Sequence, residues 1–154
     1  GLASVPTIVR SPIGLVAAMV AVLVMDRVMA PLPEGTTPPR VAAGVLTETP
    51  VDDAPARLAS VAHYLAGLAS GLLFVYFLLV VEWVLDGSSL VAVAATTLLM
   101  YVLMVAFFLV VPLPRAPGLD ASRRSTTGRD WAIAAAGYLA VLVPVSVGLT
   151  LAVA

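Results

Sequence analysis

The chain contains no cysteine and no lysine, and it has a single histidine among 154 residues. Without cysteine it can form neither disulfides nor metal sites with thiolate ligands. Charged residues make up only 11% of the chain, whereas a soluble domain has about a quarter. The net charge of −1, with no basic stripe carrying interleaved aromatic residues, gives no sign of nucleic-acid binding. These shortages exclude an ordinary soluble domain and leave few side chains for chemistry.

What the chain has in abundance is apolar sequence: 61% of its residues are hydrophobic, and its mean hydropathy is +1.08. Runs of about 20 apolar residues are long enough to cross a bilayer as helices. Ser11 as N-cap and Pro12 in the first turn mark the start of the first run. The sequence therefore predicts an all-α integral membrane four-helix bundle in one domain, with spans at about 13–30, 55–85, 90–111 and 130–154.

Two connecting segments carry most of the positive charge. Seven of the eight arginines lie in or beside the Pro-rich loop 31–54 and the Arg-rich loop 112–129, and only Arg10 lies on the other side. Arginine-rich loops stay in the cytoplasm, so we expect these loops inside and both termini outside. Within the first loop, Thr37 and the prolines of "TPPRVAAGVLTE" favour a short helix on the membrane surface, with an irregular loop as the alternative.

The second span has a stripe of small residues. Gly67 and Gly71 form a GxxxG motif with Ser70 beside it, and such motifs let two helices approach closely within a membrane. His63 lies four residues before Gly67, so it drifts only about 40° from the same face. The spacing predicts a helix contact along this stripe, with His63 turned towards protein rather than lipid.

Asp26 and Arg27 interrupt the first span one turn before its end, at a depth similar to that of His63 in the antiparallel second span. Charges in the apolar zone are usually paired, so we predict a contact among these three residues. One interpretation is a proton-linked or ligand-binding site with His63 as the cofactor-binding residue; the other is a structural clamp in which Arg27 reaches the headgroups. Haem would need a second axial ligand, from a methionine or a partner subunit.

Residues 25–74 contain a Met-rich end of the first span, followed by "PLPEG", "TPPRVAAGVLT" and "HYLAG". In these features the chain resembles a group of small four-span membrane proteins of halophilic archaea, which have no assigned activity. The resemblance implies a membrane protein of the same kind and brings no catalytic residue with it.

No nucleophile–base pair, phosphate loop or metal cluster indicates an enzyme. The hypothesis favoured by the sequence is a non-catalytic subunit that packs through its GxxxG face or first loop against a larger membrane complex, such as a respiratory or electron-transfer one. A small oligomeric transporter or channel, with Asp26, His63 and Tyr138 around an aqueous path, is a second hypothesis. A third is a protein that binds a quinone, carotenoid or lipid. No cofactor of its own is predicted, although a haem or quinone shared with a partner subunit is compatible with the pattern.

Overall fold

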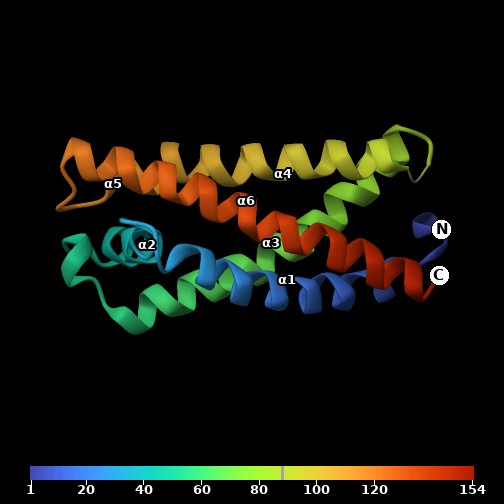
Figure 1. Ribbon diagram of the computed structural model, residues 1–154, viewed down its shortest axis with the longest axis horizontal. Coiled ribbons are helices and arrows are strands. Elements are labelled where there is room, and N and C mark those ends of the chain that lie inside the picture. Colours follow the sequence, from blue (N-terminus) through green and yellow to red (C-terminus); the bar gives the residue numbers. More distant parts are fainter. Residues whose placement is uncertain (88) are drawn as a thin grey trace.

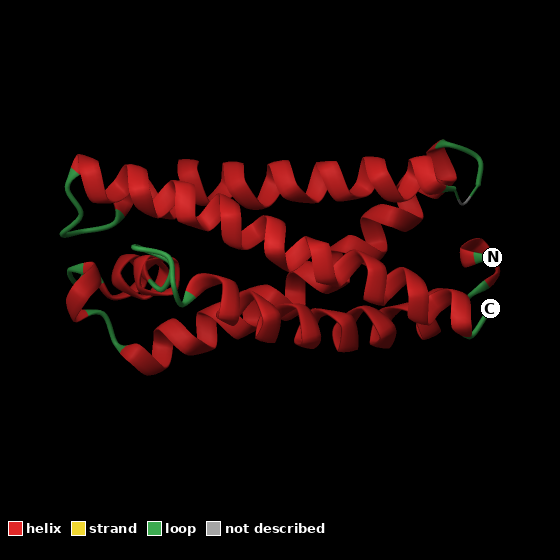
Figure 2. Ribbon diagram, in the orientation of Figure 1, coloured by secondary structure: helices red, strands yellow, loops and turns green. Residues whose placement is uncertain are grey.

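A computed structural model describes residues 1–87 and 89–154; Ser88, in the expected turn between the second and third spans, lies outside the described residues. The described chain is helical throughout, with short connections and no strand (Figure 2). Four long helices make the bundle: α1 (Thr7–Met29), α3 (Ala56–Val84), α4 (Leu90–Val110) and α6 (Ala121–Ala152). The shorter elements are η1 (Leu2–Ser4), α2 (Thr37–Thr47), η2 (Val51–Asp53) and α5 (Pro112–Arg115).

The long helices run up and down between two ends of the molecule (Figure 1). Both termini lie at one end, and α2 and α5 lie at the other. Helices α3 and α6 pass diagonally between α1 and α4. Helix α2 is seen nearly end-on in this view, so it lies across the bundle rather than along it.

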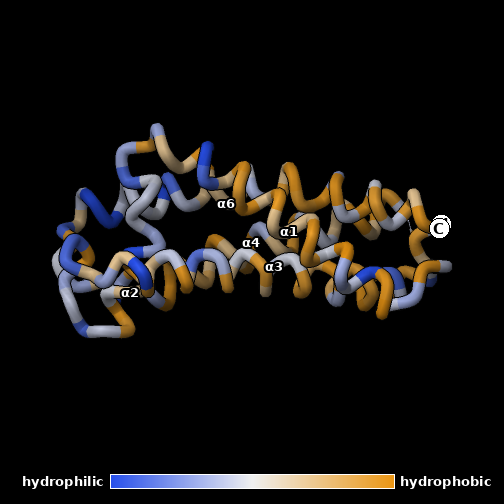
Figure 3. The backbone as a smooth tube through the Cα atoms, turned by 90° about the horizontal axis from the view of Figure 1, so that it is seen from below, coloured by the Kyte–Doolittle hydropathy of each residue, from blue (hydrophilic) through white to orange (hydrophobic). Residues whose placement is uncertain are grey.

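All four long helices are long and apolar enough to cross a membrane. Apolar residues dominate the middle of the bundle, and polar ones gather at the α2 end (Figure 3). A soluble bundle would bury its apolar residues, whereas here Ile8, Leu90 and Phe107 are 81%, 85% and 63% exposed. An apolar outer surface of this kind belongs against hydrocarbon, so the chain is a multi-pass membrane protein with a four-helix bundle fold, as the sequence predicts.

Helices α1 and α3 approach so closely that their backbones nearly touch. A Cβ built on Gly71 would lie 2.4 Å from the Ala18 Cβ and 2.8 Å from the Gly14 carbonyl oxygen, and one on Gly67 would lie 2.1 Å from a Val22 methyl. The GxxxG motif is therefore filled by α1 of the same chain. A partner protein cannot use this face, which removes one of the two surfaces that the sequence offered for a larger complex.

Helix α6 completes the core against this pair. It packs along α1, and the Tyr138 hydroxyl reaches across to donate a hydrogen bond to the Gly67 carbonyl of α3 at 2.6 Å. Tyr138, Phe74 and Leu142 are fully buried, as are the alanines of α1 that face them. Close packing and interhelical hydrogen bonds hold helices together in lipid, where burial of apolar surface adds no driving force.

The first span begins earlier than the sequence predicts. Helix α1 starts at Thr7 rather than near Ile13, so Ser11 is not the N-cap, and its hydroxyl instead donates to the Thr7 carbonyl. Pro12 lies inside the helix, where its missing N–H costs one hydrogen bond. The extra turns are held in place because they bring Arg10 to an ion pair with Glu82 of α3.

The prediction of a loop over residues 112–129 is also wrong for the second half of this segment. Helix α6 begins at Ala121, where the Asp120 side chain caps it by accepting from the Arg123 N–H at 2.8 Å. The polar residues expected in a loop are instead the first turns of the helix, and Thr127 among them is fully buried. Asp130, at the start of the expected fourth span, is fully buried as well and accepts from the Glu34 backbone N–H of the first loop.

The short helix expected in the first loop is present as α2, but it does not simply lie on a membrane surface. Val41 and Ala43 are fully buried beneath neighbouring elements, whereas Leu46 in the last turn of α2 is 68% exposed. Val41 packs in a small second core with Val51, Phe108 and Leu113. Helix α2 is therefore an integral part of the bundle end.

We predict that Gly71→Ala lowers the thermal stability of the protein in detergent, at a cost of about 1–3 kcal/mol for overpacking. The added methyl would meet backbone and a Cβ that cannot move aside. Gly148→Ala in α6 is the matched control, since nothing lies within 4 Å of its Cβ position. Equal unfolding temperatures for the two variants would contradict the tight α1–α3 contact.

Candidate functional site

A cavity of about 510 Å³ lies between α3 and α4 in the half of the bundle that holds α2. The α3 wall is made of small residues, among them Ala66, Gly67 and Ser70. The opposite wall, on α4, is formed by large flexible ones: Met100, Leu103, Met104 and Phe107. The cavity exists because α3 and α4 meet only near the termini end and diverge towards α2 (Figure 1).

Other elements close the cavity at its back and at one end. Trp131 and Tyr138 of α6 form the back, and Pro38, Pro39 and Ala42 of α2 form the end. The rim residues Leu73 and Phe107 are 46% and 63% exposed. The cavity therefore opens sideways between α3 and α4, towards the hydrocarbon layer.

Few polar atoms face this apolar space, and two of them already have partners. The Tyr138 hydroxyl donates to the Gly67 carbonyl, and the Trp131 indole N–H donates to the Met104 carbonyl at 3.0 Å. The other polar side chains of the lining are His63 and Ser70, which lie two turns apart on α3. They are the groups of the described lining that remain to orient a bound molecule.

His63 is held by a carboxylate from the neighbouring helix. Its Nε2 lies 2.7 Å from Asp26 Oδ1, and the Tyr64 hydroxyl donates to Asp26 Oδ2, also at 2.7 Å. The His63 side chain is 10% exposed and that of Asp26 is 31% exposed. A carboxylate oxygen accepts hydrogen bonds, so Nε2–H of His63 is the donor in this contact, and in the neutral imidazole Nδ1 is then an acceptor.

The structure thus brings together Asp26 and His63, as the depth argument predicts, but Arg27 is not part of their contact. Its side chain is exposed, with no hydrogen bond to either residue within the described chain. Ser70, grouped with the glycines as a helix-packing residue, instead lines the cavity. An axial bond from His63 Nε2 to a haem iron would first have to displace Asp26.

Sequence reasoning missed the ion pair between Arg10 and Glu82. Both side chains are almost completely buried, and the guanidinium makes two hydrogen bonds to the carboxylate, at 2.9 and 3.1 Å. Arg10 also donates to the Leu2 carbonyl. Arg10 and Glu82 lie at similar depths in the antiparallel helices α1 and α3, as Asp26 and His63 do. This similarity is visible in the sequence only if the first span begins at Thr7. The charge of Glu82 is balanced by that of Arg10.

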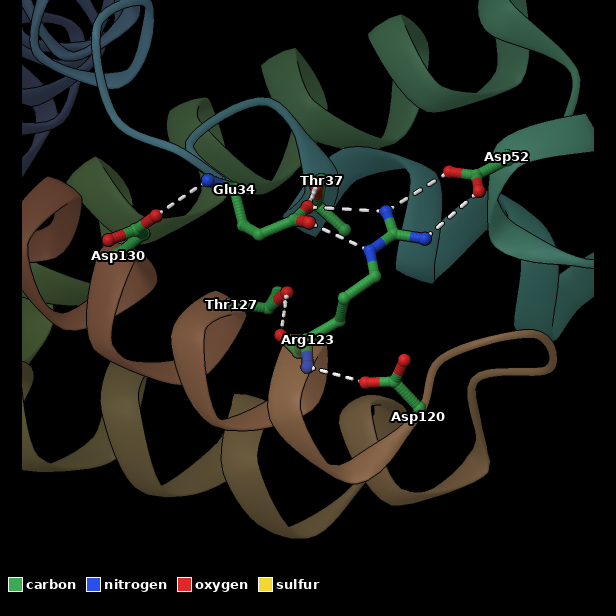
Figure 4. Close-up of polar contacts among 7 residues, drawn as sticks. All are labelled: Glu34, Thr37, Asp52, Asp120, Arg123, Thr127 and Asp130. Carbon is green, nitrogen blue, oxygen red and sulfur yellow. Dashed lines mark hydrogen bonds and ion pairs between the residues drawn. The ribbon is translucent and has the colours of Figure 1, made fainter.

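A second cluster holds α2 over the end of the cavity (Figure 4). Arg123 of α6 binds Glu34 through Nε at 2.7 Å and Asp52 through a bidentate contact at 2.9 and 3.1 Å, so one guanidinium ties α6 to both flanks of α2. The Thr37 hydroxyl also donates to Glu34. The fully buried Asp130 accepts from the Glu34 backbone N–H at 2.7 Å.

This cluster changes the acid–base behaviour of the loop. The hydrogen bond from Arg123 is the main cause that lowers the pKa of Glu34, where burial acts in the opposite direction. The same guanidinium lowers the pKa of Asp52. Both carboxylates therefore stay ionised in more acidic solution than free ones, and their contribution to folding depends on that charge.

Compared with protein-family models, with curated proteins and with solved structures, the chain matches none of them. Its function is inferred here from the side chains that form the cavity and the clusters around it.

A double-mutant cycle tests the Asp26–His63 contact. We expect Asp26→Ala, His63→Ala and the double variant to give a coupling free energy of about 0.6 kcal/mol, and at most roughly 1.7 kcal/mol, as interhelical hydrogen bonds in membranes do. Unfolding in detergent provides the measurement. Additive effects of the two substitutions would show that the residues do not interact.

The Arg123 cluster predicts a particular acid sensitivity. Because the pKa of each carboxylate is lowered on folding, its stabilisation is complete above the ordinary pKa of about 4 and is lost as the pH falls through the lowered value. We expect the wild-type melting temperature to fall more steeply than that of Arg123→Gln between pH 6 and pH 3. Arg57→Gln, which removes an exposed arginine outside the cluster, should keep the wild-type slope; a wild-type slope in Arg123→Gln would contradict the assignment.

Proposed function

We propose that this chain is an integral membrane protein that binds a prenyl-type lipid, such as a quinone or a carotenoid, in the cavity between α3 and α4. The observation that carries the proposal is the apolar cavity of about 510 Å³ with His63 on its wall. Small-molecule sites in proteins have volumes of about 300–1,000 Å³ and apolar walls with a few placed polar groups.

The sideways opening supports a ligand that arrives from the bilayer. A flexible apolar chain can enter past Leu73 and Phe107 without crossing water, and the methionines of α4 adapt to irregular shapes. The His63 ring, fixed by Asp26, offers Nδ1 to a hydroxyl or other donor on the ligand's head. A quinol or a hydroxylated carotenoid has a donor of this kind, and the Ser70 hydroxyl of the lining can donate to the carbonyl of an oxidised quinone.

The walls of the site favour this function over a transporter or channel. An aqueous path needs polar lining, whereas the described walls between His63 and Tyr138 are apolar. The hypothesis of an accessory subunit stays a prediction. Purification in mild detergent from cells that make the protein tests it: a large co-purifying membrane complex supports it, and the chain alone with a bound lipid argues against it.

Fluorescence offers a direct test of ligand binding, because the chain has only two tryptophans. Trp131 lines the cavity, whereas Trp83 is 82% exposed near the far end of α3. In Trp83→Phe protein we expect a short-chain prenylquinone to quench Trp131 with a saturable titration curve. Quenching that rises linearly without saturation, as in random collision within a micelle, would contradict the proposal.

Neighbouring residues provide matched variants for the same titration. Ala66→Phe places a ring inside the cavity, and Leu65→Phe places one on the outer face, since Leu65 is 61% exposed and is not part of the lining. Overpacking a site costs about 1–3 kcal/mol, so Ala66→Phe should weaken quinone binding about tenfold or more. Leu65→Phe should bind like its parent; equal affinities for both variants would exclude this cavity as the site.

A further inference from the structure

The two faces of α4 border different grooves. The residues at 100, 103, 104 and 107 line the cavity described above, and Val105 and Leu109 face the other way, into a groove of about 560 Å³ between α4 and α6. This second groove runs towards the α2 end of the bundle, where Leu113 continues its apolar wall.

The floor of the groove is made of small residues on α6. Gly128 and Ala132 face α4, and a Cβ on Gly128 would lie only 2.7 Å from a Leu109 methyl. The helices are close at this point, so the groove is a shallow trench with apolar sides. A trench of this form fits one extended hydrocarbon chain along a helix pair.

The polar end of the groove carries positive charge that is only partly balanced by carboxylates. Arg124 and Arg129 both line it, and no carboxylate does so among the described residues. Arg124 donates from one terminal nitrogen to the Leu119 carbonyl at 3.1 Å, while its Nε is buried with no hydrogen-bond partner. A buried donor without a partner has lost its hydrogen bond to water and gained none in return, so this guanidinium lacks an acceptor.

Arg129 has a carboxylate partner, but most of its side chain is exposed. It binds Asp130 Oδ1 at 3.0 Å, yet its side chain is 60% exposed, while Asp130 also accepts from the first loop. Three further acidic side chains at this end of the bundle have partners outside the groove: Glu34 and Asp52 bind Arg123, and Asp120 caps the α6 N-terminus. The groove end keeps a net positive charge.

We propose that this groove binds an anionic phospholipid, with its phosphate between Arg124 and Arg129 and an acyl chain that runs from Leu109 past Val105, away from the α2 end. Positive charge at one end and an apolar trench at the other match the two halves of such a lipid. Both arginines belong to the first turns of α6, at the end of the bundle where polar residues gather (Figure 3), and an anionic headgroup lies at such a polar boundary of a bilayer. The site is separate from the prenyl-lipid cavity and does not depend on it.

The test uses the whole chain in a neutral detergent, with phosphatidylglycerol, phosphatidylcholine or inorganic phosphate added and lipid binding measured by native mass spectrometry and thermal shift. We expect phosphatidylglycerol to bind and to raise the melting temperature, and the other two to do neither. Binding of phosphatidylcholine with equal affinity, or stabilisation by phosphate alone equal to that by phosphatidylglycerol, would overturn the proposal.

Matched variants place the binding at this groove. Arg124→Gln should weaken phosphatidylglycerol binding about tenfold, the effect expected for loss of a charge-assisted hydrogen bond. Arg57→Gln, the same substitution at an exposed arginine outside the groove, should leave binding unchanged. Val105→Trp keeps both arginines but fills the trench, so it should also weaken binding, which guards against a folding defect in Arg124→Gln. Wild-type affinity in both groove variants would exclude the site.

Discussion

The close contact of α1 with α3 is the constraint on which the rest of the structure depends. Gly14 and Gly71 lie opposite each other with no room for a side chain between them, and alanines continue the same contact along α1. Polar pairs fasten both ends of this seam: Arg10 with Glu82 near the termini, and Asp26 with His63 near α2. In lipid, where apolar burial cannot distinguish one helix pairing from another, such contacts define which helices are neighbours.

The cavity follows from this arrangement. Because α3 is held against α1 by its small residues, it meets α4 only where the two helices converge near the termini (Figure 1), and Trp131 and Tyr138 of α6 line the space between them. The space left between α3 and α4 is closed at one end by α2, which the Arg123 cluster holds in place. The α1–α3 contact also positions Asp26 beside His63. It therefore determines both the polar group of the cavity and the shape of the cavity wall.

Much of this fold is predictable from the sequence, because the length of an apolar run is a direct measure of a membrane span. The depth of a polar residue along antiparallel spans also predicts the Asp26–His63 contact. The same reasoning fails for Arg10 because Ser11 and Pro12 resemble a helix start, and tertiary contacts override that local signal. The polar first turns of α6 look like a loop in the sequence, because Glu34 and Asp52, the partners of Arg123, come from a distant segment. The cavity could not be predicted at all, as it depends on how far α3 and α4 diverge.

The buried pair of Arg10 and Glu82 has a consequence for how the chain enters a membrane. A charge that is buried alone costs several kcal/mol, and these two residues are separated by 72 positions. Arg10 therefore has its carboxylate partner only when α1 and α3 are packed together. The buried pair makes the insertion of the first two spans interdependent, because neither charge is balanced by the other until both helices are in place.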